Sequence, residues 1–401
     1  MNIGIACDLN VSAFESYFEE EKDKRTLRDE SLESMASAVY TLVMAYLEKE
    51  HHITLFCLAK SSFTLSSRKI KIVGISGVNG YPVRFLWGEF INAGRIKAAM
   101  DKNIADLDVL HVHWTRSYAL AATNFTNELP VLCTVRDWVP YIWKIESPKN
   151  KITWSFLYVL NEMVLRSKKV YFIANSNYTA SMLEKKLGYK VTIIPNPIKK
   201  EFLLEKERVV PKGLKLLCIS TSIDKRKNVT TLLLAFKELR KQYPDAELAL
   251  VGHNFSLTNP KVKKWQDMNL LLGVQLVGSL NHDDLPKQID QATIYVTPSL
   301  EETFGNTLLE AMARNVPVVA GENSGAIPYV LEHGKAGFLC NVSKVDELLD
   351  ALKFVHENPQ KAKEKTDFAK TVLFQKYLDE KVVENNITYY QEVISQHQNK
   401  A

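Results

Sequence analysis

The chain has 401 residues and a formal net charge of +5 at pH 7, from 51 Lys and Arg against 46 Asp and Glu. This length is more than one hydrophobic core usually supports, so we expect two domains of ordinary size. A hydrophobic content of 46% is ample for buried cores. No segment approaches the ~18 consecutive apolar residues of a membrane span, and neither a signal peptide nor a nucleic-acid-binding motif is recognisable.

The cysteines and the charge distribution bear on the environment of the protein. The five cysteines mostly fall in apolar runs and form no CxxC pair, which predicts reduced core thiols in a cytoplasmic protein. The positive charge is concentrated in residues 1–200. Solubility is the simplest explanation. The functional explanation of this charge is a basic first domain that binds a pyrophosphate-linked acceptor or an anionic lipid, with peripheral contact at the inner face of the membrane.

The first half of the chain alternates between strand and helix patterns. Residues 9–33 are polar and charged, and we expect a mobile loop or lid there. The alternation predicts a doubly wound parallel sheet. The expected strands are 1–8, 51–59, 69–75, 108–114, 129–137, 169–176 and 191–198, and the expected helices are 34–48, 89–99, 151–167 and 177–187.

A charged segment, 199–212, reads as a linker, and a second alternation follows it. The doubling predicts two Rossmann-like domains that face a central cleft. The expected strands of the second domain are 214–220, 246–252, 274–279, 293–297, 317–320 and 337–342, and the expected helices are 229–243, 262–273, 283–291, 305–315, 344–356, 359–376 and 378–396.

Residues 293–328 form a strand–helix–strand unit on which the functional argument depends. The helix N-terminus should lie at the carboxyl end of the sheet, where open α/β folds bind ligands. The N–H groups around Gly305, Asn306 and Thr307 suit a phosphate, since the helix dipole favours an anion there and Gly305 lacks a Cβ. Glu302 stands just before these donors. Glu310 lies inside the helix, where a carboxylate accepts bonds from both hydroxyls of a ribose.

Glu302 and Glu310 are separated by seven residues in the stretch SLEETFGNTLLEAMARNVPVVA. This stretch resembles the E-x7-E signature of retaining GT-B glycosyltransferases, in particular glycosyltransferase family 4. A capping loop followed by an amphipathic helix would explain a bare E-x7-E. The resemblance implies a UDP- or GDP-linked sugar donor and no metal cofactor. It implies that Glu302 binds the sugar hydroxyls and that Glu310 binds the ribose. It also places Phe304 and residues 324–328 in the donor pocket.

The sequence ISTSIDKRKN (219–228) is the second candidate site. Cations at a helix N-terminus make a diphosphate clamp, and the resemblance assigns the phosphate-binding Lys to Lys227. The family's Arg, five residues earlier, is Ser222 here, so either Arg226 or Lys225 replaces it. The alternative is a solvated turn that caps the helix at Asn228.

Two further strand ends carry polar side chains that we place on the acceptor side. HVHW contains His113, and VRDW contains Arg136 and Asp137. Family members often have a His–Asp pair at the second position, where this chain has Arg–Asp. Either His113 supplies the imidazole or none is needed. The structural alternatives are a core histidine and a plain salt bridge between Arg136 and Asp137.

Weaker signals complete the resemblance. Gly252 and Gly278 end two strands where the family holds the nucleotide base through backbone groups, and Ser176 and Asn196 match its interdomain segment. Many relatives also have a glycine-rich loop after the first strand, but this chain has no glycine between Gly4 and Gly74.

The expected protein is therefore a retaining glycosyltransferase that moves a hexose-type sugar from a nucleotide diphosphate sugar to a hydroxyl of a glycan or lipid-linked glycan, in surface polysaccharide biosynthesis. Residues 1–198 and the crossover helix 378–401 would bind the acceptor, and residues 199–377 the donor. The alternatives are a non-catalytic GT-B subunit that binds a partner enzyme, and a nucleotide-sugar epimerase.

Overall fold

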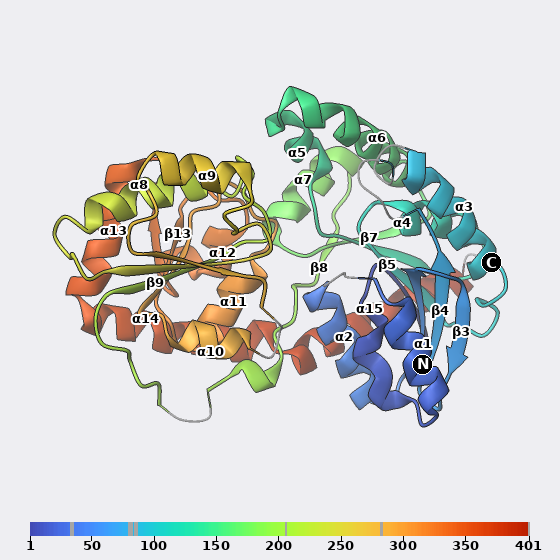
Figure 1. Cartoon of the computed structure of the whole chain (residues 1–401). Coiled ribbons are helices and arrows are strands. Elements are labelled where there is room, and N and C mark those ends of the chain that lie inside the picture. Colours follow the sequence, from blue (N-terminus) through green and yellow to red (C-terminus); the bar gives the residue numbers. More distant parts are fainter. Residues whose placement is uncertain (33–35, 79–82, 84–86, 205–206, 281–283, 400–401) are drawn as a thin grey trace. The chain divides into compact units, whose positions relative to one another are not determined.

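The computed structural model describes residues 1–32, 36–78, 83, 87–204, 207–280 and 284–399 (Figure 1). The predicted segments 9–33, 34–48, 199–212, 283–291 and 378–401 therefore lie partly outside the described residues. The chain forms two units: unit 1 comprises Met1–Pro197 and Asp379–Ala401, and unit 2 comprises Ile198–Leu378.

Unit 1 contains an eight-stranded sheet with the order β3-β4-β2-β1-β5-β6-β7-β8. Neighbouring strands are parallel except for β3 and β4, which are antiparallel. The strand expected at 191–198 is short because Pro195 and Pro197 have no N–H to donate to a neighbour. The strands are β1 (Asn2–Ala6), β2 (His52–Ala59), β3 (Phe63–Ser66), β4 (Ile70–Ser76), β5 (Val109–His113), β6 (Val131–Val135), β7 (Tyr171–Ala174) and β8 (Thr192–Ile193).

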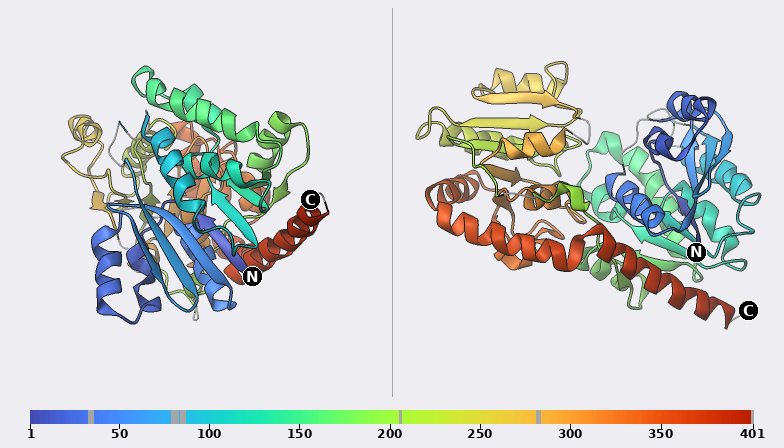
Figure 2. Two further views of the ribbon diagram at one scale, coloured as in Figure 1. Left: turned by 90° about the vertical axis from the view of Figure 1, so that its right-hand side faces the viewer. Right: turned by 90° about the horizontal axis from the view of Figure 1, so that it is seen from below.

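Helices cover both faces of this sheet (Figures 1 and 2). Successive residues of β2 alternate between two cores: Leu55 and Cys57 pack with α2 and α15, and Phe56 and Leu58 with α3, α4, α6 and α7. The strands are therefore apolar on both faces. The helices are η1 (Val11–Tyr17), α1 (Glu21–Glu30), α2 (Ser37–Glu48), α3 (Glu89–Met100), α4 (Ser117–Ala122), η3 (Thr123–Phe125), α5 (Val139–Ile145), α6 (Pro148–Leu165), α7 (Asn177–Leu187) and α15 (Asp379–Gln398).

The expectation of a loop at residues 9–33 is wrong for the part that the structure describes, whereas the expected lid stays a prediction. Most of it is helical, in η1 and α1. Phe14 and Leu27 are fully buried and Phe18 is 4% exposed, so these few apolar side chains anchor a segment that is otherwise charged. The edge strand β3 and the short helices α4 and α5 are also absent from the elements predicted from the sequence.

Unit 2 contains a parallel six-stranded sheet with the order β11-β10-β9-β12-β13-β14 and helices on both faces. Both units thus confirm the prediction of α/β domains with doubly wound parallel sheets. The elements are η4 (Lys200–Phe202), β9 (Lys215–Ile219), α8 (Val229–Leu239), β10 (Glu247–Val251), α9 (Pro260–Asp267), β11 (Val274–Gly278), α10 (Leu285–Asp290), β12 (Ile294–Thr297), α11 (Asn306–Ala313), β13 (Val318–Gly321), α12 (Ile327–Val330), η5 (Glu332–Gly334), β14 (Phe338–Cys340), α13 (Val345–Glu357), α14 (Pro359–Val372) and η6 (Leu373–Tyr377).

The strand orders place one switch point in each sheet. From β9 the chain proceeds outward to β10 and β11, and then returns to β12 on the other side of β9. In unit 1 the order reverses between β1 and β5 in the same way. Open α/β sheets bind ligands beyond the carboxyl ends of the strands at such points. The loops that follow β9 and β12 are therefore the first place to look for a site in unit 2.

The hydroxyl of Tyr390 joins α15 to the rest of unit 1. Tyr390 Oη lies 2.7 Å from Tyr46 Oη on α2 and 2.5 Å from His111 Nδ1 on β5. His111 Nε2 lies 2.7 Å from Thr134 Oγ1 on β6. All four side chains are buried. This chain of hydrogen bonds therefore ties the last helix to two strands and a helix from the first third of the sequence.

Two further findings bear on the predictions from composition. All five cysteines are buried free thiols, as expected. Among the described residues, no helix combines the length and the apolar character that crossing a membrane requires.

We predict that Tyr390→Phe lowers the free energy of unfolding by about 1–3 kcal/mol, because it leaves two buried polar groups without their partner. Urea unfolding followed by circular dichroism measures the change. Tyr329→Phe, at a side chain that is 42% exposed in unit 2, is the matched control and should shift stability by less than about 0.5 kcal/mol. Equal effects of the two variants would contradict a stabilising role for this network.

Candidate functional site

The loops after β9 and β12 are held together by backbone and amide hydrogen bonds. Leu300 N donates to Arg226 O at 2.7 Å, and Asn228 Nδ2 donates to Pro298 O at 3.1 Å. On the other side of the β12 loop, Ala326 N donates to Glu302 O at 2.8 Å. The loop that carries Glu302 is therefore fixed between its two neighbours at the carboxyl edge of the sheet.

Lys227 and Glu302 form an ion pair across these loops. Lys227 Nζ lies 2.6 Å from Glu302 Oε1, and the two side chains are 13% and 15% exposed. Arg226 Nη1 lies 3.7 Å from Glu302 Oε2 and 3.6 Å from Glu301 Oε2. Burial alone would raise the pKa of Glu302, but the charges of Lys227 and Arg226 outweigh it and lower that pKa. Glu302 is therefore an ionised carboxylate at neutral pH.

Asp224, which the sequence analysis did not assign a role, shapes the turn that presents Lys227. Asp224 Oδ1 accepts from Lys227 N at 3.0 Å, and Oδ2 accepts from Ser222 Oγ at 2.7 Å. Ser222, which stands where the resemblance expects an Arg, thus helps to hold this turn. Of the two candidate replacements, Arg226 faces the carboxylates and Lys225 is exposed to solvent.

Glu310 lies in the second turn of α11 and is 5% exposed. Within the described part of the chain, its Oε2 atom is buried without a hydrogen-bond partner. Burial raises the pKa of Glu310 to about 8, so the side chain is mostly a neutral acid at pH 7. Buried polar atoms usually have partners, and a titratable group shifted in this way marks a candidate binding position.

The start of α11 has the geometry that the sequence predicts. Gly305 is the N-cap residue with a φ of 97°, a left-handed conformation that favours glycine. Thr307 Oγ1 lies 2.6 Å from Tyr295 Oη. Burial is the main cause that raises the pKa of Tyr295, and Cys218, Glu310 and Glu302 add to it in the same direction. Glu310 lies on the helix that begins directly after the loop of Glu302.

The other donor-side candidates are packed around the same edge of the sheet. Phe304 is buried, and its ring meets Tyr377 edge-on with 5.7 Å between centroids. Gly252 N donates to Gly278 O at 2.8 Å, at the ends of β10 and β11. Gly252 has a φ of 147°, and a Cβ there would lie 1.9 Å from Ser220 O. Only glycine therefore allows this close approach of two loops.

In unit 1, Arg136 connects His113 to Asn196. Arg136 Nε donates to His113 Nδ1 at 3.3 Å, and Nη1 donates to Asn196 Oδ1. Burial and the nearby charges of His111 and Arg136 lower the pKa of His113, which is therefore neutral. Its Nε2 atom is buried without a partner among the residues that the structure describes. Burial also lowers the pKa of Arg136 to about 10.

Two other predicted positions have identified partners. Asp137 Oδ2 lies 3.2 Å from Arg116 Nη2, in an ion pair between side chains that are 33% and 26% exposed. Ser176 is the N-cap of α7, and its Oγ accepts from Thr179 N at 3.2 Å. In the described ranges, no group of three or more His, Cys, Asp or Glu side chains is arranged to hold a metal ion.

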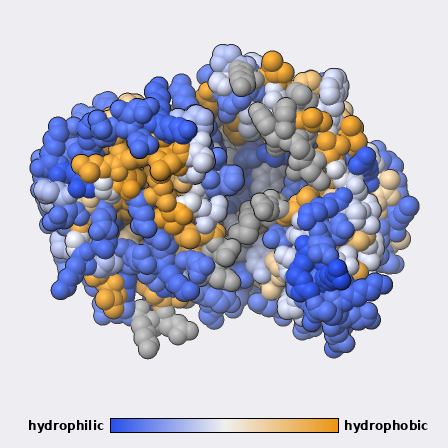
Figure 3. Space-filling view, viewed as in Figure 1, coloured by the Kyte–Doolittle hydropathy of each residue, from blue (hydrophilic) through white to orange (hydrophobic). Residues whose placement is uncertain are grey.

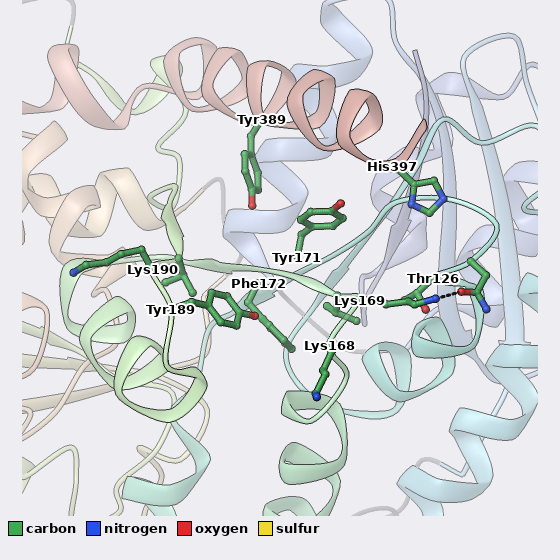
Figure 4. A pocket seen from close by; sticks show the side chains of 12 residues that line it. Thr126, Lys168, Lys169, Tyr171, Phe172, Tyr189, Lys190, Tyr389 and His397 are labelled. Atoms are coloured by element: carbon green, nitrogen blue, oxygen red, sulfur yellow. Dashed lines mark hydrogen bonds between the residues drawn. The ribbon is translucent and has the colours of Figure 1, made fainter. Parts of the chain in front are cut away.

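Two cavities lie at the opposite, amino-terminal edges of the sheets. One, of about 460 Å³, is formed by residues 126–127, 168–172 and 189–191, together with α15, from which Tyr389 and His397 extend toward Tyr171 (Figure 4). The other, of about 860 Å³, lies in unit 2 beside the starts of β9, β12 and β13. Neither contains a residue that the sequence analysis predicted for the site.

Two known families match this chain, and their matches together span residues 35–372. The family described as Glycosyl transferases group 1 matches residues 201–372, and the family described as Glycosyltransferase Family 4 matches residues 35–202.

Curated relatives match at lower coverage. The chain is 28% identical over 200 residues to N-acetyl-alpha-D-glucosaminyl L-malate synthase from Bacillus anthracis, with 49% of this chain and 50% of that protein covered. It is 27% identical over 263 residues to a phosphatidyl-myo-inositol mannosyltransferase from Mycobacterium tuberculosis, with 63% and 65% covered. The match thus spans between about half and two-thirds of the length of these relatives.

Solved structures match over almost the full length. Sucrose-phosphate synthase from Thermosynechococcus elongatus has a TM-score of 0.79 at 17% identity and covers 98% of this chain and 99% of its own. The Anabaena protein HepE in complex with UDP-glucose has a TM-score of 0.69 at 16% identity, with 99% and 100% covered. The two family matches, which follow one another along residues 35–372, show that the chain belongs to glycosyltransferase family 4. The solved structures show that it has the GT-B fold.

Proposed function

We propose that this chain is a retaining glycosyltransferase that transfers a hexose-type sugar from a nucleotide diphosphate sugar to a hydroxyl of a glycan or lipid-linked glycan. The observation that carries the proposal is the position of the Lys227–Glu302 pair beyond the carboxyl ends of β9 and β12, at the switch point of unit 2. Buried Glu310 lies on α11, the helix that follows the β12 loop. Switch points of this kind bind ligands in open α/β sheets.

Unit 2 recognises the donor in this proposal. The carboxylate of Glu310 accepts hydrogen bonds from the two ribose hydroxyls, which gives its buried Oε2 the partner that it lacks. The first N–H groups of α11 and its dipole favour the diphosphate. Gly252 and Gly278 approach the base through their backbones. UDP is the first nucleotide to test, because HepE is described in complex with UDP-glucose.

The cations of the β9 loop stabilise the departing diphosphate. The Lys227 ammonium has three N–H donors, and Glu302 uses one of them. The remaining two can meet phosphate oxygens while the ion pair persists. Arg226 adds a second positive charge at the same edge. One well-placed donor to developing negative charge is worth about 3–4 kcal/mol of transition-state stabilisation.

The bond changes follow the mechanism that retaining transferases of this fold are expected to use. The acceptor oxygen forms a bond to the anomeric carbon on the face from which the diphosphate departs, so the configuration is kept. The bond between the anomeric carbon and the phosphate oxygen breaks, and a phosphate oxygen takes the acceptor proton. Glu302, held in place by Lys227, accepts hydrogen bonds from sugar hydroxyls.

We assign the acceptor to unit 1. His113 is the neutral imidazole on this side, and Arg136 positions it through the Nε–Nδ1 hydrogen bond. Asp137 and its partner Arg116 lie at the same strand ends. The two relatives reported above act on unlike acceptors by name, malate and phosphatidyl-myo-inositol. A cytoplasmic role in surface polysaccharide synthesis with a lipid-linked acceptor is our proposal within that range.

We predict that the affinity for UDP increases with pH up to about pH 8. Glu310 is protonated below its pKa of about 8 in the unliganded protein, and binding through its carboxylate must release that proton. The dissociation constant should therefore fall by up to about tenfold per pH unit below pH 8 and level off above it. Calorimetric titrations at several pH values measure this dependence.

Glu310→Gln is the matched control for that prediction. The variant keeps the size of the side chain and leaves the ionisation of the phosphates of UDP unchanged, but it has no carboxylate. We expect weaker binding at pH 8, by about tenfold or more, and a flatter pH dependence than that of the unaltered protein. Parallel pH profiles would contradict the assignment of Glu310 to the ribose.

We predict that Lys227→Ala lowers turnover by about 10²–10³-fold, because one donor to the leaving diphosphate is lost. The adjacent Lys225→Ala is the matched control: it removes a charge from the same turn, but its side chain is exposed to solvent. Steady-state kinetics with a competent donor and acceptor compare the two, and thermal unfolding shows that both are folded. Equal turnover in the two variants would place the phosphate clamp elsewhere.

A further inference from the structure

Helix α6 carries a line of apolar side chains, three of them exposed and one, Phe156, half-buried. Ile152, Phe156, Val159 and Met163 follow one another at intervals of four, three and four residues, which places them along one side of the helix. Ile152 is 65% exposed, Val159 53% and Met163 46%. The buried side of α6 carries other residues, Leu157, Leu160 and Val164, which belong to the core of unit 1.

A second pair of exposed apolar residues extends this line onto α3. The ring of Trp87, just before α3, meets Phe156 edge-on with 5.0 Å between centroids. Trp87 is 65% exposed, and Ile91, four residues later, is 47% exposed. Figure 3 shows hydrophobic residues gathered in this part of unit 1, where Figure 1 shows α6 and α3. We call these six residues, Trp87, Ile91, Ile152, Phe156, Val159 and Met163, the α6 patch.

Single exposed apolar side chains are common on soluble proteins, but a contiguous group marks an interaction surface. The α6 patch includes a tryptophan, whose amphipathic ring suits the boundary between lipid and water. Five of its residues lie on α3 and α6, and Trp87 directly precedes α3. All of them except the half-buried Phe156 are exposed to solvent, and none lines either of the two cavities described above.

The charges beside the α6 patch are mainly positive. Arg95, four residues after Ile91 on α3, is exposed, and so is Arg166 at the end of α6. Lys151 precedes Ile152, and its Nζ lies 4.9 Å from the ring centroid of Trp143. The acidic residue on this part of α6, Glu162, already pairs with Lys186 at 2.6 Å. Cations with apolar side chains between them match a surface of anionic headgroups over acyl chains.

We propose that the α6 patch docks unit 1 onto an anionic lipid surface. Its apolar side chains enter the boundary between headgroups and acyl chains, and Arg95, Lys151 and Arg166 meet lipid phosphates. The patch lies on different elements from Lys227, Glu302 and Glu310, so docking is a property separate from donor binding. It would give the enzyme access to an acceptor that is held in a membrane.

Sedimentation of the full-length protein with vesicles tests this proposal. We expect binding to vesicles of phosphatidylglycerol and phosphatidylcholine, weaker binding when phosphatidylcholine is used alone, and weaker binding at high salt. Ile152→Ser combined with Val159→Ser should reduce binding to the anionic vesicles by about tenfold or more, since two apolar side chains no longer insert. Trp87→Ser should act in the same direction.

Leu272→Ser in unit 2 is the matched control, because its side chain is 75% exposed and lies outside the α6 patch. It should leave vesicle binding unchanged. Calorimetric binding of UDP should be the same in all variants, so a failure of docking is distinguishable from a failure of the proposed function.

Two results would overturn the proposal: vesicle binding that the Ile152 and Val159 substitutions do not affect, and no binding of the unaltered protein to any vesicle. Light scattering tests the other possible occupant of the α6 patch, a second copy of this chain. A dimer that the same substitutions dissociate, without vesicle binding, would make the α6 patch an interface between two copies.

Discussion

The ion pair between Lys227 and Glu302 connects the fold of unit 2 to its proposed chemistry. The 2.6 Å contact exists because β9 and β12, which are far apart in sequence, are neighbours at the point where the strand order reverses. The backbone bond from Leu300 to Arg226 and the turn built by Asp224 set the approach of the two loops. A cation and a carboxylate are thus held at the sheet edge before any substrate arrives, and this preorganisation is what electrostatic catalysis requires.

At this edge of the sheet, the pKa values of the two carboxyl groups, Glu302 and Glu310, are shifted in opposite directions. The pKa of Glu302 is lowered, because Lys227 and Arg226 outweigh the effect of burial, whereas burial without a cation raises the pKa of Glu310. Glu302 therefore exists as an anion that can accept bonds from hydroxyl groups at neutral pH. Glu310 remains neutral until a ligand supplies donors that favour its charged form. Binding of the donor is therefore coupled to the release of one proton from the buried carboxyl group of Glu310.

Much of the fold follows from the sequence, because buried parallel strands are apolar on both faces and alternate with amphipathic helices. The E-x7-E spacing also predicts the approach of Glu302 and Glu310 to the start of α11. The helices within 9–33 were missed because Phe14, Phe18 and Leu27 are few among charged residues. The pairing of Lys227 with Glu302, the inward direction of Arg136 and the pKa of Glu310 depend on tertiary contacts, and no local pattern encodes them.

The most direct test of the account is a thermal-shift screen of UDP, GDP, ADP and CMP with their sugar conjugates, each with and without EDTA. A ligand at about 100 times its dissociation constant stabilises the folded protein by about 2.7 kcal/mol, which raises its melting temperature measurably. We predict a shift with a nucleoside diphosphate or its sugar conjugate that EDTA does not alter, and the loss of this shift in Glu310→Ala. No shift with any nucleotide, or a shift that Glu310→Ala retains in full, would contradict a donor site at this corner of unit 2.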